Sequence, residues 1–399
     1  MNRIDTDTLR TGQIFSQPVY SEGSNLLVPA MVPLLQRDID FLYTWGIEAV
    51  STEGYMLSEE EIAAATAAAV EEISEPEFEY EPVDLGDVKL SISDVQKNSG
   101  PYRAYKSLIE KLDSVFVGIK AGVDIEMRVI DGISTQLLND LRSYPNNFVG
   151  YILGGEVTGH ELAKSSVNTA ILSALTAQEL RLPNHKILNI VSGALLHDIG
   201  MIRLSKGITE KKGGLSDAEF EQIKSHPLHS SKIVSKELFG NNEVNLIALH
   251  HHERWDGKGY PDQLAGNAID MGARIVSVAD AFEAMVSKKS YRESIVGYQA
   301  VKNMLADNAR RFDPAVIMAF TKIMGIYPIG SIIRLNDESV ARVLSVNSNA
   351  PLRPAVQLLV NKSGKVYKSG EGEIIDLLTE KTLFIKKAID PAEFAGTDE

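Results

Sequence analysis

Apolar residues recur at intervals of three and four positions through the middle of the chain. Leu108, Leu112 and Val115 show this spacing, and similar series follow them. Because one face of an α-helix repeats at this interval, the pattern predicts amphipathic helices. We expect a helical segment over residues 91–150 that packs on a larger, all-helical domain over residues 151–326.

The pattern changes at both ends of the chain. Residues 1–57 contain short apolar stretches broken by turn residues, with a short helix expected around residues 34–45, which predicts a small α+β module. Residues 327–392 contain short runs typical of strands, separated by turns such as the one at residues 347–349. We expect a small β-barrel-like module there, so the predicted fold class is mainly α with a small module at each end.

An acidic linker is predicted over residues 58–90. The stretch from Ser58 to Asp87 holds eleven acidic residues and neither lysine nor arginine. The formal net charge of the whole chain is -14, so the remaining residues together carry only -3. Surfaces that bind nucleic acid are usually basic, so DNA and RNA are not expected partners. A small phosphate ligand in a local basic pocket is compatible with this charge.

The composition of the 399-residue chain narrows the chemistry further. Hydrophobic residues make up 44% and charged residues 24%, as in folded globular proteins. The start lacks the apolar region of a signal peptide, and no apolar run reaches the ~20 residues of a membrane span, so we expect a cytoplasmic protein. The chain has no cysteine, so a metal site would use histidine, carboxylate and water.

All eight histidines fall within less than a quarter of the chain. A lone His-Asp pair is more often a surface pair or a helix cap than a metal site, and histidines at a helix end can be stabilised by the helix dipole. The clustering favours metal binding, because an imidazole supplies one nitrogen and a carboxylate can bridge two ions. The informative residues are His197, Asp198, His226, His251, His252 and Asp280.

The same region carries a specific motif. Residues 251–261 read His-His-Glu-Arg-Trp-Asp-Gly-Lys-Gly-Tyr-Pro. The accompanying elements are His197-Asp198-Ile199-Gly200, His226-Pro227, the segment Ala273 to Phe282, Ser290-Tyr291-Arg292 and Phe312-Asp313-Pro314. Over residues 156–325 the sequence therefore resembles the HD-GYP family of bacterial cyclic di-GMP phosphodiesterases, which belong to the HD superfamily.

The resemblance implies an all-helical HD fold that holds two or three divalent metal ions, iron or manganese. The metal ligands that it implies are Glu161, His197, Asp198, His226, His251, His252 and Asp280. It implies that Asp198 is the catalytic bridging carboxylate for the hydroxide that attacks phosphorus. The substrate-binding residues that it implies are Lys289, Arg292, Gly259, Tyr260 and Pro261. The remaining candidates, His185, His229 and His250, are expected to have structural or solvent roles.

Two positions depart from the family pattern. The family has a ligand histidine 32 residues before the His-Asp pair, where this chain has Ser165. It also has a lysine directly after His-Asp-x-Gly, where this chain has Met201. The resemblance therefore implies one under-coordinated metal ion and one missing positive charge near the substrate phosphate.

Three functions stay open at this point. The retained ligand positions favour metal binding in all three. The first, which we prefer, is an active phosphodiesterase that converts cyclic di-GMP to pGpG or GMP. The second is a degenerate domain that binds cyclic di-GMP or metal for signalling with little or no turnover. The third is an HD-type hydrolase that acts on another nucleotide. Protein contacts through the Gly-Tyr-Pro loop and a homodimer are further interpretations.

The acidic linker leads to a test of the domain organisation. Its Glu-Pro alternation from Glu75 to Pro82 disfavours a helix, so this segment should be extended and accessible to proteases. Limited proteolysis should cut between Phe78 and Asp84 and release a carboxy-terminal fragment that keeps the metals and the turnover of the intact chain. A fragment that loses its metals or unfolds would show that the amino-terminal module is part of the catalytic domain's fold.

Overall fold

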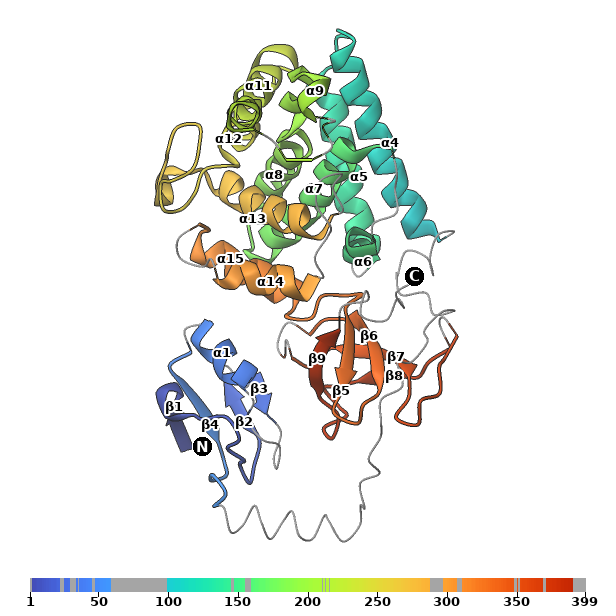
Figure 1. Ribbon diagram of the computed structural model, residues 1–399. Helices are drawn as coiled ribbons and strands as arrows, with labels where there is room; N and C mark the ends of the chain where they lie inside the picture. The colour runs from blue at the N-terminus through green and yellow to red at the C-terminus, as the bar shows by residue number, and fades with distance from the viewer. Residues whose placement is uncertain are drawn as a thin grey trace.

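The structure is a computed structural model. It describes residues 2–21, 25–28, 34, 36–44, 47–58, 99–144, 147–154, 159–209, 211, 213–214, 216–287, 297–306, 311–347, 350, 352–368 and 371–389. They form a helical domain and two small modules that each contain a β-sheet (Figure 1). The predicted fold class, mainly α with a small module at each end, is confirmed. The predicted acidic linker lies outside the described residues from residue 59 onward.

The amino-terminal module is a four-stranded antiparallel sheet with one helix. Its strands lie in the order β1-β4-β2-β3. The elements are β1 (Asn2–Asp5), η1 (Thr6–Thr8), β2 (Val19–Ser21), β3 (Asn25–Val28), α1 (Gln36–Thr44) and β4 (Ala49–Thr52). The module has a hydrophobic core of its own, which includes Phe15, Val19, Leu34, Leu42 and Val50. The apolar stretches in the first 57 residues therefore form the core of this module.

The carboxy-terminal module is a five-stranded antiparallel sheet in the order β8-β7-β6-β5-β9. Its strands are β5 (Ile332–Leu335), β6 (Val340–Ser345), β7 (Ala355–Val360), β8 (Ile374–Asp376) and β9 (Ile385–Ile389). The sequence pattern indicated the first four strands and missed β9, in which two lysines interrupt the apolar residues. Val346 packs against both this core and the helical core, and Tyr298 stacks on Tyr327 with ring centroids 5.1 Å apart. The sheet therefore rests on the helical domain.

The helical domain begins with a long hairpin and ends before the second sheet. Its α-helices are α4 (Gly100–Lys120), α5 (Met127–Ser143), α6 (Asn147–Gly154), α7 (Glu161–Glu179), α8 (Asn184–Leu196), α9 (Lys206–Thr209), α10 (Asp217–Ile223), α11 (His226–Lys232), α12 (Asn242–His250), α13 (Met271–Val286), α14 (Gly297–Ala306) and α15 (Pro314–Met324). The domain also contains two short 3-10 helices, η3 (Ile199–Arg203) and η5 (Gly266–Ala268), and a short π-helix, η4 (Ile233–Glu237). None of the described helices is both long and apolar enough to cross a membrane.

Helix α7 runs through the middle of this domain. It packs against α4, α8, α13 and α15, and most of its length is buried. Many of its buried side chains are alanine, serine or threonine, which lets the neighbouring helices approach closely. Two of these neighbours carry candidate metal ligands, since His197 and Asp198 follow the last residue of α8 and Asp280 lies on α13.

Ile247 joins three of these helices. This α12 residue is only 1% exposed. A Cβ atom on Gly193 of α8 would lie 2.6 Å from Ile247 Cγ2, and one on Gly272 of α13 would lie 2.6 Å from Ile247 Cδ1. Two glycines therefore leave the space that Ile247 fills, because protein interiors are close-packed. This contact sets α12 against α8 and α13, which all carry candidate metal ligands.

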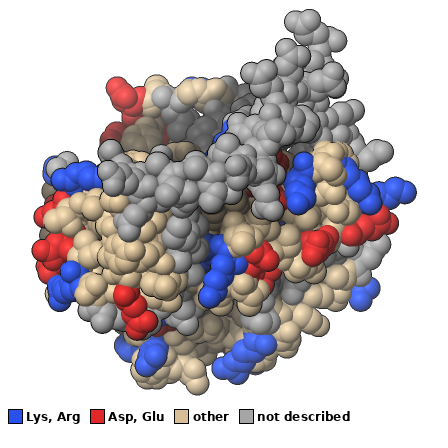
Figure 2. Space-filling view, turned by 90° about the horizontal axis from the view of Figure 1, so that it is seen from below, with Lys and Arg blue, Asp and Glu red and all other residues tan. Residues whose placement is uncertain are grey.

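Charges of both signs lie on the face that is seen from below in Figure 2. The described lysine, arginine, aspartate and glutamate side chains are interspersed there. Over the described part of this face there is no extended basic patch of the kind that binds a nucleic-acid backbone.

The position of Ile247 predicts a large effect on stability. Ile247→Ala should lower the free energy of unfolding by about 2–5 kcal/mol, because it removes buried methyl groups and leaves a cavity between three helices. Val117→Ala is the control, since Val117 is 59% exposed on α4 and should change the free energy by less than about 0.5 kcal/mol. Urea unfolding followed by circular dichroism, with chelator present, measures both. Equal effects would contradict this account of the packing.

Candidate metal centre

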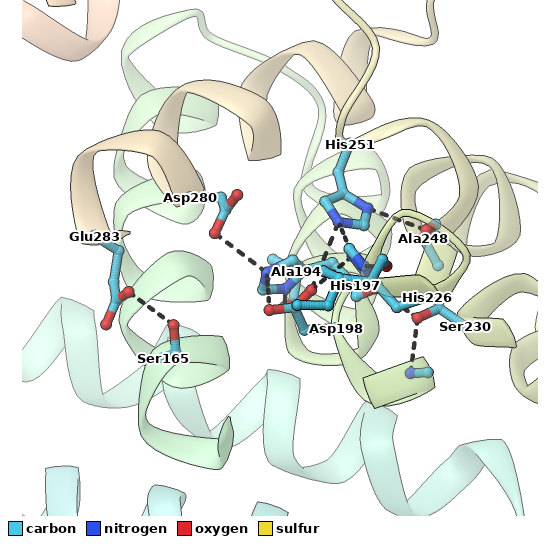
Figure 3. A network of polar contacts seen from close by, with 12 residues as sticks. Ser165, Ala194, His197, Asp198, His226, Ser230, Ala248, His251, Asp280 and Glu283 are labelled. Carbon is cyan, nitrogen blue, oxygen red and sulfur yellow. Dashed lines mark hydrogen bonds and ion pairs between the residues drawn. The ribbon is translucent and has the colours of Figure 1, made fainter. Parts of the chain in front are cut away.

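The structure brings together six of the residues that the sequence indicated as ligands. One group has its ligand atoms within 4.8 Å of one another and consists of Asp198, His226, His251 and His252. A second group meets the same limit and consists of His197, Asp198 and Asp280. The side chains converge from the end of α8, the start of α11, the end of α12 and the middle of α13 (Figure 3).

Asp198 belongs to both groups and uses a different oxygen in each. Its Oδ1 lies 3.0 Å from Nε2 of His226 and 3.7 Å from Nε2 of His251. Its Oδ2 lies 3.6 Å from Nε2 of His197, which in turn lies 3.5 Å from Oδ1 of Asp280. A carboxylate that turns one oxygen toward each of two ligand groups has the geometry of a bridging ligand.

Backbone carbonyls at helix ends orient three of the imidazoles. The last carbonyls of a helix lack an N–H partner within it, so they are free to accept from a side chain. Nδ1 of His197 lies 2.7 Å from the carbonyl of Ala194, and Nδ1 of His251 lies 3.0 Å from that of Ala248. Nδ1 of His226 likewise lies 2.7 Å from the carbonyl oxygen at the end of α10. In each ring Nδ1–H donates outward, so the Nε2 lone pair points into the site.

In this arrangement, hydrogen-bond acceptors face one another at the centre of the site. Nε2 of His226 and Nε2 of His251 are 3.2 Å apart, and both face the carboxylate of Asp198. Nε2 of His197 is buried and has no hydrogen-bond partner among the described residues. Neutral imidazoles and carboxylates cannot satisfy one another in this arrangement, because the one N–H of each of these rings already donates to a backbone carbonyl and no proton points into the site. A positive charge is required at the centre, and divalent metal ions fit it.

The pKa shifts show the same demand for positive charge. Burial disfavours the imidazolium of His197, but Asp198 and Asp280 outweigh burial and raise the pKa of His197 to about 9. Burial opposes ionisation of Asp198, yet the neighbouring His197 holds the pKa of that carboxyl well below its usual range. Burial lowers the pKa of His251 and His252, so both rings are neutral at physiological pH. A neutral imidazole is the form that binds a metal ion.

Two motif glycines allow the backbone to close around the site. A Cβ atom on Gly200 would lie 2.1 Å from the carbonyl oxygen of His226, so only glycine lets η3 approach α11. A Cβ atom on Gly259 would lie 2.4 Å from the amide nitrogen of Arg254, which fixes the Gly-Tyr-Pro loop against the end of α12. The loop is also held by the buried carboxylate of Glu253, which accepts from the amides of Asp262 and Leu264 at 2.6 and 3.1 Å.

The other sequence candidates lie in different surroundings. Glu161 is exposed at the start of α7 and lies outside both ligand groups, so its role as a ligand stays a prediction. Tyr260 packs on His252 with ring centroids 4.8 Å apart. Gly259 and Pro261 flank Tyr260 in the same loop. Lys289 and Arg292 lie outside the described residues.

Ser165 takes part in a buried hydrogen-bond network. Its hydroxyl donates to Oε2 of Glu283 at 2.7 Å (Figure 3). The other oxygen of Glu283 accepts from Asn168 at 3.2 Å and from Ser287 at 2.6 Å. Asn168 in turn accepts from the hydroxyl of Tyr105 at 2.6 Å. The network ties α7 to α13 one turn after Asp280.

The sequence reasoning missed Glu283 and Glu253. Glu253 lies inside the motif of residues 251–261, directly after the two histidines, and Glu283 directly follows the segment that ends at Phe282. A charged residue next to a ligand on an otherwise apolar helix was the available signal. Glu283 pairs with Ser165, 118 positions away, and Glu253 accepts from amides in a loop, and neither contact follows from a periodic pattern along the chain.

Two family models match separate parts of the chain. Residues 158–316 match the family model of the HD domain, and residues 332–397 match that of the KOW domain associated with the HD domain. The helical part of the chain therefore contains an HD domain, as the sequence resemblance implied.

Three proteins with sequences similar to this chain are each named as a cyclic di-GMP phosphodiesterase. The cyclic di-GMP phosphodiesterase PdeB of Borreliella burgdorferi is 27% identical over 77% of this chain and 81% of its own length. The cyclic di-GMP phosphodiesterase PA4108 of Pseudomonas aeruginosa is 27% identical over 92% of this chain and 87% of its own length. The cyclic di-GMP phosphodiesterase response regulator RpfG of Xanthomonas campestris pv. campestris is 38% identical over 38% of this chain and 40% of its own length.

The hydrogen bond of Ser165 predicts a structural effect. Ser165→Ala should lower the free energy of unfolding by about 1–3 kcal/mol, because Glu283 loses a buried donor, and should leave the metal content per chain unchanged. Ser166→Ala is the matched control, since Ser166 is also buried and its Oγ has no hydrogen-bond partner among the described residues. Urea unfolding and elemental analysis measure the two quantities. A loss of metal in Ser165→Ala alone would show that the hydroxyl is a ligand.

Proposed function

We propose that this chain is a metal-dependent phosphodiesterase that hydrolyses cyclic di-GMP to pGpG or GMP. The observation that carries the proposal is the carboxylate of Asp198, whose two oxygens face two separate sets of ligand atoms. Two cation positions joined by one carboxylate suit in-line displacement at a phosphodiester. The three relatives named cyclic di-GMP phosphodiesterases support the choice of substrate.

The residues fit two divalent cations, one in each ligand group. His226, His251 and His252 with Asp198 would hold one ion, and His197, Asp198 and Asp280 would hold the other. Iron or manganese is the proposed metal, since the ligands are nitrogen and oxygen with no thiolate. Bound there, the cations would stabilise charge on the phosphoryl oxygens and lower the pKa of the attacking water.

The exposure of the candidate ligands indicates which side of the site is open to a substrate. The side chains of His197 and His251 are fully buried, whereas those of Asp198 and Asp280 are 22% and 17% exposed. The imidazoles therefore fix the cations from inside the helical domain, and the two carboxylates face the side from which a substrate can enter. The C-terminal ends of α8 and α12, where His197 and His251 lie, add negative dipole potential that favours cations.

The Gly-Tyr-Pro loop forms one side of the proposed entrance. Tyr260 lies against His252 and can contact a bound nucleotide through its ring or its hydroxyl. Gly259 and Pro261 set the course of the loop beside it. Lys289 and Arg292 remain predicted phosphate contacts. The reaction is proposed for the cytoplasm.

A second candidate function is a binding and signalling domain with little turnover. Ser165 favours it, because its hydroxyl is committed to Glu283 and the chain lacks the imidazole that the family places there. Met201 favours it as well, because no cation stands at that position. Such a domain would keep its metals and bind cyclic di-GMP without cleaving it.

Metal content and turnover test the two candidates together. Protein purified anaerobically without chelator should hold at least two ions per chain and should hydrolyse cyclic di-GMP with iron or manganese. Asp198→Asn should lower turnover by about 100-fold or more, because the shared ligand loses its charge. Asp124→Asn, at an exposed carboxylate in the α4–α5 turn, is the control and should change neither quantity. Less than one ion per chain after reconstitution would overturn the metal centre, and binding without turnover would favour the signalling domain.

A further inference from the structure

A strip of aromatic and basic side chains leads from the surface to the metal centre. Nζ of Lys224 lies 5.0 Å from the ring centroid of Phe220 and 6.0 Å from that of Tyr260. Tyr260 in turn lies 4.8 Å from the ring centroid of the candidate ligand His252. The strip therefore places an ammonium group between two aromatic rings beside the ligands.

The outer end of this strip is open to solvent. Phe220 is 49% exposed on the short helix α10, although exposing a large apolar side chain to water is energetically unfavourable. The side chain of Lys224 is 32% exposed and pairs with Glu221 at 2.6 Å, whose side chain is 67% exposed. An exposed ion pair of this kind contributes little to stability, so the ammonium can exchange the carboxylate for another anion.

Arg311 supplies a second cation beside the segment that carries the Gly-Tyr-Pro loop. Its guanidinium carbon lies 5.1 Å from the ring centroid of the neighbouring Phe312. The backbone carbonyl of Arg311 accepts from the amide of Trp255, which anchors it to the Gly-Tyr-Pro loop. Arg311 is exposed and forms no ion pair with any carboxylate in the described part of the chain.

We propose that Phe220, Lys224, Tyr260 and Arg311 form a nucleotide-binding rim of the metal centre. Lys224 and Arg311 bind the phosphodiester oxygens, because ammonium and guanidinium groups form charge-assisted hydrogen bonds with phosphate. Phe220 and Tyr260 offer ring faces on which a planar base can stack. The ligand class is thus an anionic phosphodiester that carries a nucleobase. The assignment rests on the proposed function and adds the residues that recognise its substrate.

The rim also supplies a positive charge in place of the one that is missing at Met201. The family pattern has a lysine at that position, and this chain supplies no charge there. Lys224 lies two residues before the candidate ligand His226, so it brings a cation to the same centre from a different helix. Positive charge at the rim attracts a doubly charged dinucleotide toward a centre whose own side chains include two carboxylates.

Steady-state kinetics on the metal-loaded enzyme test the rim. Lys224→Ala and Arg311→Ala should each raise the KM for cyclic di-GMP about tenfold, with kcat changed less than about threefold, because they remove phosphate contacts and leave the metal ligands intact. The increase should shrink as salt is added, since exposed charges are screened. Lys224→Arg should restore KM to within about threefold of the wild type. Phe220→Leu should raise KM about fivefold without salt dependence, because it keeps the apolar volume and removes the ring face.

Controls separate this proposal from the proposed function. Lys106→Ala removes an exposed lysine on α4, 54% exposed in its side chain, and should leave KM unchanged. Metal content should equal that of the wild type in every variant. If the wild type binds cyclic di-GMP without turnover, calorimetric titration with cyclic di-GMP replaces kinetics, and weaker binding by Lys224→Ala and Arg311→Ala still supports the rim. Wild-type affinity in both variants would overturn the rim while the function stands, and a wild type that does not bind cyclic di-GMP would overturn both.

Discussion

The structure depends on a convergence of hydrogen-bond acceptors that cannot satisfy one another. The carboxylate of Asp198 faces the Nε2 atoms of His226 and His251 on one side and of His197 on the other. Burying such groups without positive charge is unfavourable, because each loses water and gains no donor. The surrounding helices hold this arrangement in place, and a cation bound between these groups would satisfy them.

The fold sets this geometry with ordinary local devices. The imidazoles are oriented by carbonyls at helix ends, such as those of Ala194 and Ala248, so each ring is fixed by the element that carries it. The helices are then brought together by close contacts that require small residues. Ile247 packs in the space left by glycines on two neighbouring helices, and Gly200 lets η3 touch the backbone of α11. A larger residue at Gly200 would displace a metal ligand as well as lower stability.

Ser165 illustrates how a departure from a family pattern can acquire its own structural role. Its hydroxyl donates a hydrogen bond to Glu283, whose carboxylate also accepts hydrogen bonds from Asn168 and Ser287. All of these groups are buried, so removing any one donor should lower the free energy of unfolding. The network links α7 and α13 one turn beyond Asp280, and so the region where the family has an imidazole contributes here to the position of a carboxylate ligand.

The sequence by itself determined the mainly helical fold class and indicated the six side chains that converge in the structure as candidate metal ligands. Helical periodicity is local, as at Leu108 and Leu112, and ligand chemistry is a property of each residue type, so both can be recognised without coordinates. Only the tertiary structure decided that the two oxygens of Asp198 serve different groups, and that Ser165 pairs with Glu283, 118 positions away. Such contacts depend on how helices pack against one another, and the spacing of apolar residues along one helix does not specify which face of a distant helix it meets.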